Sequence, residues 1–379
     1  MLPSLRSAGA TAEAHAVALL TKVHFWRTGA GHRTRILGLA RALSEAMHLS
    51  VVWPLALSDE DRAALAQALP GARVHALNLP PQGSADEARA TLAHFFAARA
   101  HTACIFEYLD LAWLRPAVPP GVLSLVDTHD VVSERDAALQ AAGVELGRQV
   151  LSSAQERARL ALFDKVLAIS EADAQVFSRW LGAQRVLLVP HAAELHHCPQ
   201  RPALRRLLFV GSQYAPNTQG LRWFLQDVWP RLAGLGLTLD VVGGAGPAMG
   251  LQAGDGVQVH GQVQDLHAAY ALADICINPV HMGSGLKIKT VEALAHGRPL
   301  VTTSHGARGL ERHGGVAFCV ADEAQSFADA IMRLVLQPEQ AASVALAGQA
   351  LAAKTFGPSA CYGPLLQLLQ GRRAAEGVN

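Results

Sequence analysis

Short apolar runs alternate with amphipathic stretches along the chain, and this alternation predicts its elements. Residues 16–25 form an apolar run typical of a buried strand, and residues 33–46 then carry their apolar side chains at helical spacing. Continuous apolar strands separated by helices indicate a parallel sheet covered on both faces. In the first half we expect further strands at 49–57, 73–79, 102–108, 122–127, 165–170 and 185–190, and helices at 59–69, 85–100, 147–163 and 171–181.

The alternation stops and then begins again. Residues 195–204, LHHCPQRPAL, are typical of a linker because Pro and His interrupt the periodicity. The pattern predicts an α/β protein of two doubly wound, Rossmann-like domains that face a cleft, since ligands of such sheets bind beyond the carboxyl ends of the strands. In the second half we expect strands at 205–211, 237–244, 257–261, 274–280, 299–304 and 315–320, and helices at 217–233, 264–272, 286–296, 325–337 and 339–353.

Composition narrows the class of protein. The 379 residues suit two domains at roughly 150 residues each, and a chain that is 50% hydrophobic and 17% charged is globular. A net charge of +1 excludes a protein that coats nucleic acid. Five scattered cysteines without a C-x-x-C pair are typical of reduced thiols in the cytoplasm. We expect residues 1–15 to form a loose arm, with a weak signal peptide as the alternative, and no apolar run reaches the roughly 18 residues of a membrane span.

A glycine loop followed by a basic helix start is the most informative segment. The loop 283–285 follows a predicted strand, and Lys287 and Lys289 stand in the next helical turn. Helix N-termini attract anions, so two cations and glycines there indicate a phosphate site. Glu292 lies seven residues beyond Gly285, about 10 Å along the helix and near the same face, where a carboxylate can accept hydrogen bonds from ribose hydroxyls. The alternative is a solvated Lys/Glu helix face.

This segment resembles the donor site of retaining glycosyltransferases of family four, which have the GT-B architecture. In that family a second glutamate precedes Ala-x-Ala-x-Gly-x-Pro; here Glu292 precedes residues 293–299, ALAHGRP. Ser284 stands where the family has its first glutamate, as in a known subgroup with small residues there and an added lysine. The resemblance implies that Ser284, Gly285 and Leu286 bind the donor diphosphate through their backbone.

The resemblance extends over nearly the whole chain. The loop from Gly211 to Asn217 resembles the one that lies near the phosphates, although it lacks the Arg and Lys of many members. Backbone groups of Gln262 and Val263 are expected to bind the base. The resemblance divides the chain into an acceptor-side domain, 1–198, and a donor-binding domain, 199–379, whose last helix packs back on the first domain.

Two segments of the first half resemble the acceptor side of the family. Gly29, Gly31 and His32 lie in a loop like the one that faces sugar and acceptor; a dinucleotide fingerprint is the alternative, but its third glycine and ribose acid are missing. Asp127, His129 and Asp130 end a strand where the family keeps a His–Asp pair, and a carboxylate orients a histidine and makes it more basic. A capped turn is the alternative there. Glu107, at the end of a neighbouring strand, is a further candidate of the acceptor side.

Two groups of metal-ligand residues have simpler explanations. Residues 191–198 contain His191, Glu194, His196, His197 and Cys198, but their spacing fits no standard zinc pattern. Residues 59–61 have D-x-D spacing, yet they follow Ser58 and are typical of a capped helix start. We therefore expect no metal and no cofactor besides the sugar nucleotide as co-substrate.

The function implied by the resemblance is transfer of a sugar from a nucleoside-diphosphate sugar to an acceptor hydroxyl, with retention and without a metal. Lys287 and Lys289 are expected to stabilise the leaving diphosphate, while His129 positions sugar and acceptor. The acceptor is expected to be a sugar or a lipid-linked sugar, in polysaccharide or glycoconjugate assembly, in the cytoplasm or at the inner membrane face. A sugar-nucleotide epimerase and a non-catalytic nucleotide-sugar binding protein are the alternatives, and a dehydrogenase is disfavoured.

Overall fold

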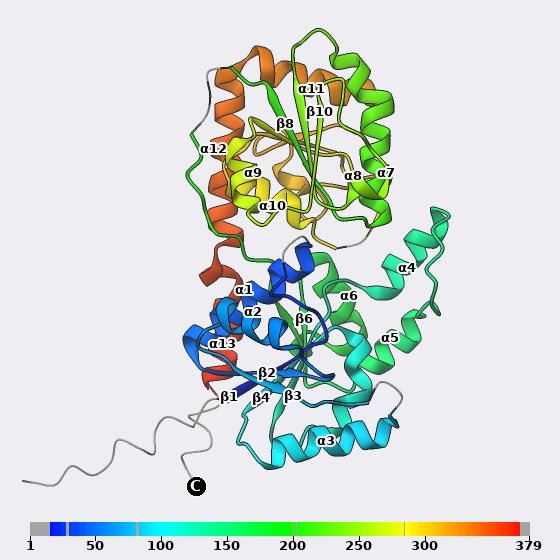
Figure 1. Ribbon diagram of the computed structural model, residues 1–379, viewed down its shortest axis with the longest axis vertical. Coiled ribbons are helices and arrows are strands. Elements are labelled where there is room, and N and C mark those ends of the chain that lie inside the picture. The colour runs from blue at the N-terminus through cyan, green and yellow to red at the C-terminus, as the bar shows by residue number, and fades with distance from the viewer. Residues whose placement is uncertain are drawn as a thin grey trace, which may run out of the picture.

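Two parallel sheets, each covered by helices on both faces, lie one above the other along the long axis of the molecule (Figure 1). This computed structural model describes residues 16–27, 30–80, 83–199, 201, 203–283 and 285–371. The α/β class and the two doubly wound, Rossmann-like sheets predicted from the apolar pattern are confirmed. The expected arm at 1–15 lies outside the described residues.

The first sheet has seven strands in the order β3-β2-β1-β4-β5-β6-β7. Alternate residues of its central strand enter different cores: Val17 and Leu19 pack on one face, and Ala18 and Leu20 on the other. The elements are β1 (Ala16–Leu20), α1 (Gly31–Ala46), β2 (His48–Trp53), α2 (Asp59–Ala68), β3 (Arg73–Ala76), α3 (Ala85–Ala97), β4 (Ala103–Glu107), η1 (Leu109–Ala117), β5 (Leu123–Asp127), α4 (Val132–Ala141), α5 (Ser153–Leu160), β6 (Lys165–Ala168), α6 (Glu171–Leu181), η2 (Ala183–Arg185) and β7 (Val186–Leu188).

The second sheet has six strands in the order β10-β9-β8-β11-β12-β13. Strand order reverses beside β1 in the first sheet and beside β8 here, and ligands of such sheets bind where the order reverses. The elements are β8 (Arg206–Val210), α7 (Ala215–Trp223), η3 (Phe224–Val228), η4 (Trp229–Leu232), β9 (Thr238–Val242), α8 (Ala245–Ala248), β10 (Val257–Gly261), α9 (Leu266–Leu272), β11 (Ile275–Asn278), α10 (Ile288–Ala295), β12 (Leu300–Thr302), η5 (Glu311–His313), β13 (Cys319–Val320), α11 (Ala324–Leu336), α12 (Pro338–Phe356) and α13 (Pro358–Gly371).

Several predicted elements are shorter than expected. The strand predicted at 16–25 ends at Leu20, because the Thr21 hydroxyl accepts a hydrogen bond from the Val23 N–H and turns the chain. The strand predicted at 315–320 keeps only β13, since Gly315 has a φ of 81° and belongs to a turn. The helix predicted at 217–233 breaks into α7, a π-turn and a 3-10 turn that contains Pro230.

The chain passes between the two halves twice, at neighbouring places. The first passage is the segment that follows β7, and the second is the junction of α12 and α13 at Gly357. The Ala193 N–H of the first passage donates a hydrogen bond to the Phe356 carbonyl at the second (2.8 Å). Beyond it α13 packs beside α1, where Leu365 shares one core with Leu39. Among the described residues no helix has the length and apolarity to cross a bilayer.

Candidate active site

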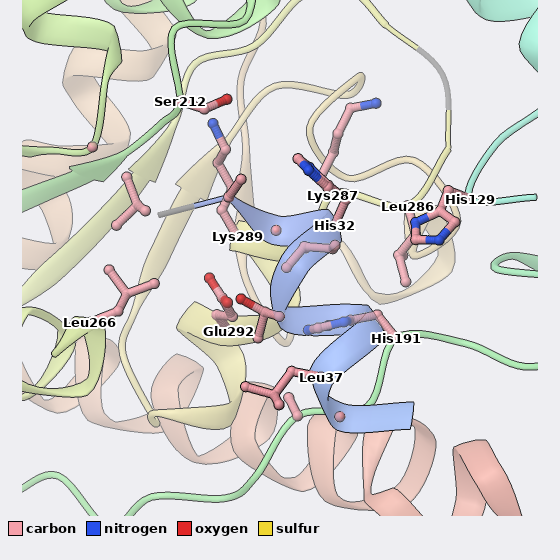
Figure 2. Close-up of a pocket in the computed structure, with 18 of the residues that line it drawn as sticks. His32, Leu37, His129, His191, Ser212, Leu266, Leu286, Lys287, Lys289 and Glu292 are labelled. Carbon is pink, nitrogen blue, oxygen red and sulfur yellow. The ribbon is translucent and has the colours of Figure 1, made fainter. Parts of the chain in front are cut away.

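A cavity of about 950 Å³ lies between the two sheets, at the carboxyl ends of their central strands. Both halves supply its walls: helix α1 and the loop after β5 on one side, and the loop after β8 and the start of α10 on the other (Figure 2). This is the edge at which doubly wound sheets bind ligands. The predicted site residues that line the cavity are Gly31, His32, His129, Asp130, Gly211, Asn217, Gln262, Val263, Leu286, Lys287, Lys289 and Glu292.

The basic start of α10 faces this cavity. Lys287 holds the N-cap position without a side-chain cap, and the first turn contains no acid. Lys287 Nζ donates a hydrogen bond to the Gly285 carbonyl (3.1 Å). Lys289 Nζ donates to Asn217 Oδ1 (2.6 Å) and lies 4.8 Å from the centre of the Phe209 ring. Both cations therefore lie where the helix end already carries positive charge.

The surrounding protein disfavours the charged form of both lysines. Loss of hydration lowers the pKa of Lys287 to about 8 and that of Lys289 to about 7, and a nearby cation adds to each effect. For Lys289 that cation is Lys287. Both side chains are only partly exposed. An anion bound in the cavity would favour the charged forms, so the site is suited to a phosphate group.

Glu292 lies on the same helix, one turn further into the cavity wall (Figure 2). Its Oε2 accepts a hydrogen bond from the Tyr270 hydroxyl (3.0 Å). Burial raises the pKa of Glu292 to about 7, against the opposing effects of the Tyr270 hydrogen bond and the Lys289 charge. A carboxylate with one oxygen anchored and the group facing the cavity can accept hydrogen bonds from ligand hydroxyls.

The loop between β8 and α7 is held close to the lysines. Asn217 Nδ2 donates to the carbonyl and the hydroxyl of Ser212 (3.1 and 3.2 Å), which leaves Oδ1 for Lys289. Gly243, from the loop after β9, has a φ of 98°, and a Cβ there would lie 2.3 Å from the Gly211 carbonyl. Only glycine allows these two loops to approach so closely.

On the opposite wall His129 is held by Glu107. His129 Nε2 and Glu107 Oε2 share a hydrogen bond (2.7 Å), and the imidazole stacks on the Tyr108 ring at a centroid distance of 4.1 Å. Glu107 is fully buried, and this burial together with the nearby Asp127 raises its pKa. His129 has a φ of 61°, which turns the chain sharply after β5.

The His–Asp resemblance led us to expect an aspartate, Asp127 or Asp130, beside His129. The structure instead places Glu107 there. Asp127 accepts two hydrogen bonds from Arg35 (2.8 and 2.9 Å) and lies 3.7 Å from His129 Nε2. Asp130 lines the cavity but pairs with Arg135 (2.9 Å). Within the described chain each aspartate pairs with an arginine, whereas His129 is hydrogen-bonded to Glu107.

The remaining predicted residues lie at the edge of the cavity, beneath its wall or outside the described part of the chain. Gly285 has a φ of 69°, and a Cβ there would lie 3.4 Å from the His129 carbonyl, so the loops of the two halves meet at this point. Gly29 and Ser284 lie outside the described residues. Glu107 and Asp127 lie beneath the cavity wall, both completely buried.

Sequence reasoning considered His191 only as a metal ligand and did not single out Tyr270. His191 lines the cavity, and burial, followed by the Arg35 charge, lowers its pKa to about 3. Its position directly after a predicted strand was a usable signal, because ligands bind at strand ends. Tyr270 gave no such signal, since an aromatic residue on a predicted helix is typical of core packing.

Neither of the two groups of metal-ligand residues considered in the sequence forms a metal site among the described residues. The Ser58 hydroxyl caps α2, and Asp61 accepts hydrogen bonds from Trp26 (2.9 Å) and Arg27, so Asp59–Asp61 serves as a helix start. The five residues of the 191–198 segment do not converge on one point in the described chain. His196 instead meets two histidines that are distant in sequence, His267 and His296.

Comparisons with known proteins support the fold. Residues 205–337 match the family model described as "Glycosyl transferases group 1". The fold is similar to sucrose-phosphate synthase from Thermosynechococcus elongatus, with a TM-score of 0.72 and 19% identity over 95% of this chain and 100% of that one. It is also similar to Anabaena HepE in complex with UDP and glucose, with a TM-score of 0.71 and 15% identity over 93% and 99% of the two chains.

A curated relative matches part of the chain. It is described as an uncharacterized 44.6 kDa protein in the cps region of Klebsiella pneumoniae, and it is 29% identical over 188 residues. The match covers 45% of this chain and 47% of that one, so it spans about half of the relative's length.

Proposed function

From a chain with the GT-B fold and a group 1 glycosyltransferase domain at residues 205–337, we infer an enzyme that transfers a sugar from a nucleoside-diphosphate sugar to an acceptor hydroxyl. The observation that carries this proposal is the pair of cations at the start of α10, which face the cavity between the halves. A bound pyrophosphate would compensate their charge, and the positive end of the helix would add to the attraction.

The donor is proposed to lie along the second half. Lys287, Lys289 and the 283–286 loop hold the pyrophosphate, and Glu292 accepts hydrogen bonds from the ribose. Gln262 and Val263 line the part of the cavity where the base is proposed to lie. UDP and glucose occupy the similar fold of HepE, which makes UDP-sugars the first donors to test.

The chemical step follows from these positions. As the glycosyl carbon loses the diphosphate, negative charge develops on the leaving oxygen, and preorganised cations and N–H groups stabilise it. We propose retention of configuration, with the leaving phosphate accepting the acceptor proton, so that neither an enzymic nucleophile nor a metal is needed. His129, fixed by Glu107, and His32 would position sugar and acceptor on the first half.

The acceptor is proposed to be a sugar or lipid-linked sugar, in polysaccharide or glycoconjugate assembly at the inner membrane face. The cps-region relative supports a polysaccharide role.

Two measurements test the proposal. First, a panel of UDP-, GDP- and ADP-sugars is screened for an increase in melting temperature, because a ligand that binds only the folded state stabilises it. Second, the stabilising donor is incubated with and without candidate acceptors. Consumption only with an acceptor supports a transferase; isomerisation of the donor alone would indicate an epimerase, and stabilisation without turnover a binding protein.

A further inference from the structure

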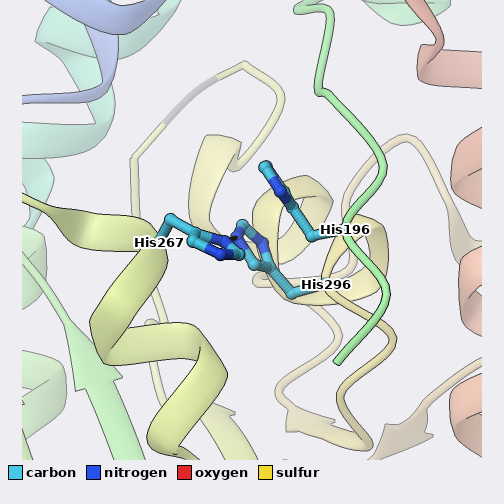
Figure 3. A group of neighbouring side chains, drawn as sticks. All are labelled: His196, His267 and His296. Carbon is cyan, nitrogen blue, oxygen red and sulfur yellow. Dashed lines mark hydrogen bonds between the residues drawn. The ribbon is translucent and has the colours of Figure 1, made fainter. Parts of the chain in front are cut away.

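Three imidazoles from three separate elements meet at the edge of the cavity, behind Glu292. His196 comes from the segment between the halves, His267 from α9, and His296 from the C-cap of α10 (Figure 3). One ring nitrogen from each lies within 4.8 Å of the others. His296 Nε2 and His267 Nδ1 are 3.1 Å apart. All three residues line the cavity, so a small ion can reach them.

The hydrogen bonds of His296 fix which of its nitrogens is free. Its Nδ1 lies 2.7 Å from the Glu292 carbonyl, and a carbonyl only accepts, so Nδ1 carries the proton. The lone pair is therefore on Nε2, which points toward His267. A histidine that donates one N–H to a backbone carbonyl and presents its other nitrogen has the usual arrangement of a metal ligand.

We propose that His196, His267 and His296 form a binding site for one zinc-class divalent transition-metal ion, with a fourth position open to the cavity. Imidazole nitrogen favours Zn²⁺, Ni²⁺ and Cu²⁺ over the hard cations Mg²⁺ and Ca²⁺. Two nitrogens at 2.0–2.1 Å from a tetrahedral Zn²⁺ are about 3.3 Å apart, which is close to the His296–His267 separation.

His196 completes the site by a rotation of its ring. Its imidazole now stacks on that of His296 at a centroid distance of 4.3 Å, and its side chain is partly exposed. Its backbone is already fixed: the N–H donates to the Ala295 carbonyl (3.0 Å), and its own carbonyl accepts from Gln349 (2.8 Å). Only the side chain has to move to direct its nitrogen at the ion.

The ion would tie the segment between the halves to the wall that carries Glu292. It would not touch the lysines that are proposed to hold the diphosphate, so the proposal concerns an ion that joins these two segments and stands apart from metal-assisted sugar transfer. The competing explanation is a stack of neutral rings in which the His267 Nδ1–H donates to His296 Nε2. That explanation predicts no affinity for Zn²⁺ at these residues.

Calorimetric titration of Zn²⁺ into the full-length, untagged, chelator-treated protein tests the site. We expect one equivalent to bind, and Co²⁺ in its place to give the visible spectrum of a tetrahedral complex. His267→Ala removes an exposed ligand and is expected to weaken Zn²⁺ binding at least about tenfold. His197→Ala, next to His196 in the same segment but outside the cluster, is the matched control and is expected to leave the affinity unchanged. Mg²⁺ is expected not to compete.

The proposal is overturned if the wild-type protein binds no equivalent of Zn²⁺, or if His267→Ala binds it as tightly as the wild type. Equal melting temperatures of the metal-free wild type and variant show that the variant is folded. Because the measurement is metal binding in the absence of any sugar nucleotide, its outcome is independent of whether the chain transfers sugars.

Discussion

Glu292 and Lys289 stand on one face of α10 and change their charge near the same pH in opposite ways. Burial raises the pKa of Glu292 to about 7 and lowers that of Lys289 to about 7. Below pH 7 the lysine is charged and the carboxyl takes up its proton; above pH 7 the carboxylate is ionised and the lysine loses its charge. The form with both groups ionised is therefore most populated near pH 7.

We expect kcat/KM for the sugar-nucleotide donor to depend on pH as a bell with its maximum near 7. The acid limb reflects protonation of Glu292, which then accepts ribose hydrogen bonds poorly, and the alkaline limb reflects loss of the Lys289 charge. In Lys289→Arg the guanidinium stays charged, so the alkaline limb should move toward 8, the pKa of Lys287. A profile that is flat from pH 6 to 8, with the donor saturating normally, would contradict this explanation.

Removal of both lysines tests the phosphate site itself. Lys287→Ala together with Lys289→Ala should lower kcat by about 100-fold or more, because removal of even one preorganised donor from a developing anion costs about 10²–10³ in rate. Steady-state kinetics with the preferred donor measure this effect. Lys354→Ala, an exposed lysine on α12, is the control and should leave kcat unchanged. Wild-type turnover in the double variant would remove the basis of the proposed function.

At the residue scale, the sequence revealed those side chains that are out of place for their local element. Two lysines at a helix start are unusual, so Lys287 and Lys289 could be singled out and do face the cavity. The hydrogen-bond partner of His129 could not be identified from the sequence. Glu107 and Asp127 lie opposite each other in the register of β4 and β5, and only the distant Arg35, which binds Asp127, leaves Glu107 to the histidine.

At the scale of elements, the starts of α1 and α10 touch across the cavity. Gly31 opens α1, and a Cβ there would lie 3.0 Å from Cδ1 and 3.2 Å from Cβ of Ile288, the first residue of α10. The glycine therefore sets how closely the two halves approach beside the lysines.

Gly31→Ala should lower kcat/KM by about tenfold, because the two helix starts must separate and small displacements of reacting groups are costly. Adding Ile288→Ala removes two of the three close atoms and should restore part of the activity. The control is Gly371→Ala at the end of α13, where only the neighbours in the chain lie within 4 Å of the new Cβ, and it should leave the kinetics unchanged. Equal kinetics of Gly31→Ala and the wild type would show that this contact does not control the spacing.

The elements that the sequence predicted are those with a strong apolar period. The strands β1, β4 and β5 are almost entirely buried and β8 is buried at its centre, so continuous apolar runs marked them. Helix α4 was missed because its buried face is mostly polar: it consists of Ser133, Asp136 and Leu139. Asp136 is held there by Arg148, a contact that no local pattern shows.

At the scale of the whole molecule, the last helix belongs to the core of the first sheet. Leu365 and Tyr362 of α13 are buried in the same cluster as Leu39 and Leu43 of α1. Helix α13 therefore contributes to the stability of the first half, although it lies close to the end of the chain.

Leu365→Ala should lower the free energy of unfolding by about 2–5 kcal/mol, the usual cost of a cavity in a packed core. Urea denaturation measures the loss, and hydrogen exchange should assign it to β1 and α1 rather than to β8 and β9. Leu346→Ala, 69% exposed on α12, is the control and should change stability by less than about 0.5 kcal/mol. Increased exchange confined to the second sheet would refute the assignment of α13.

The hydrogen bond between Ala193 and Phe356 joins the two segments of the chain that connect the halves. Two connections that are hydrogen-bonded side by side define a single hinge axis. We therefore expect the two halves to open and close about this edge, whereas sliding of one half along the other is resisted. The far rim of the cavity then travels most. Release of the nucleoside diphosphate product would require the two halves to open. A disulfide placed across that rim should therefore slow turnover without disturbing the fold of either half.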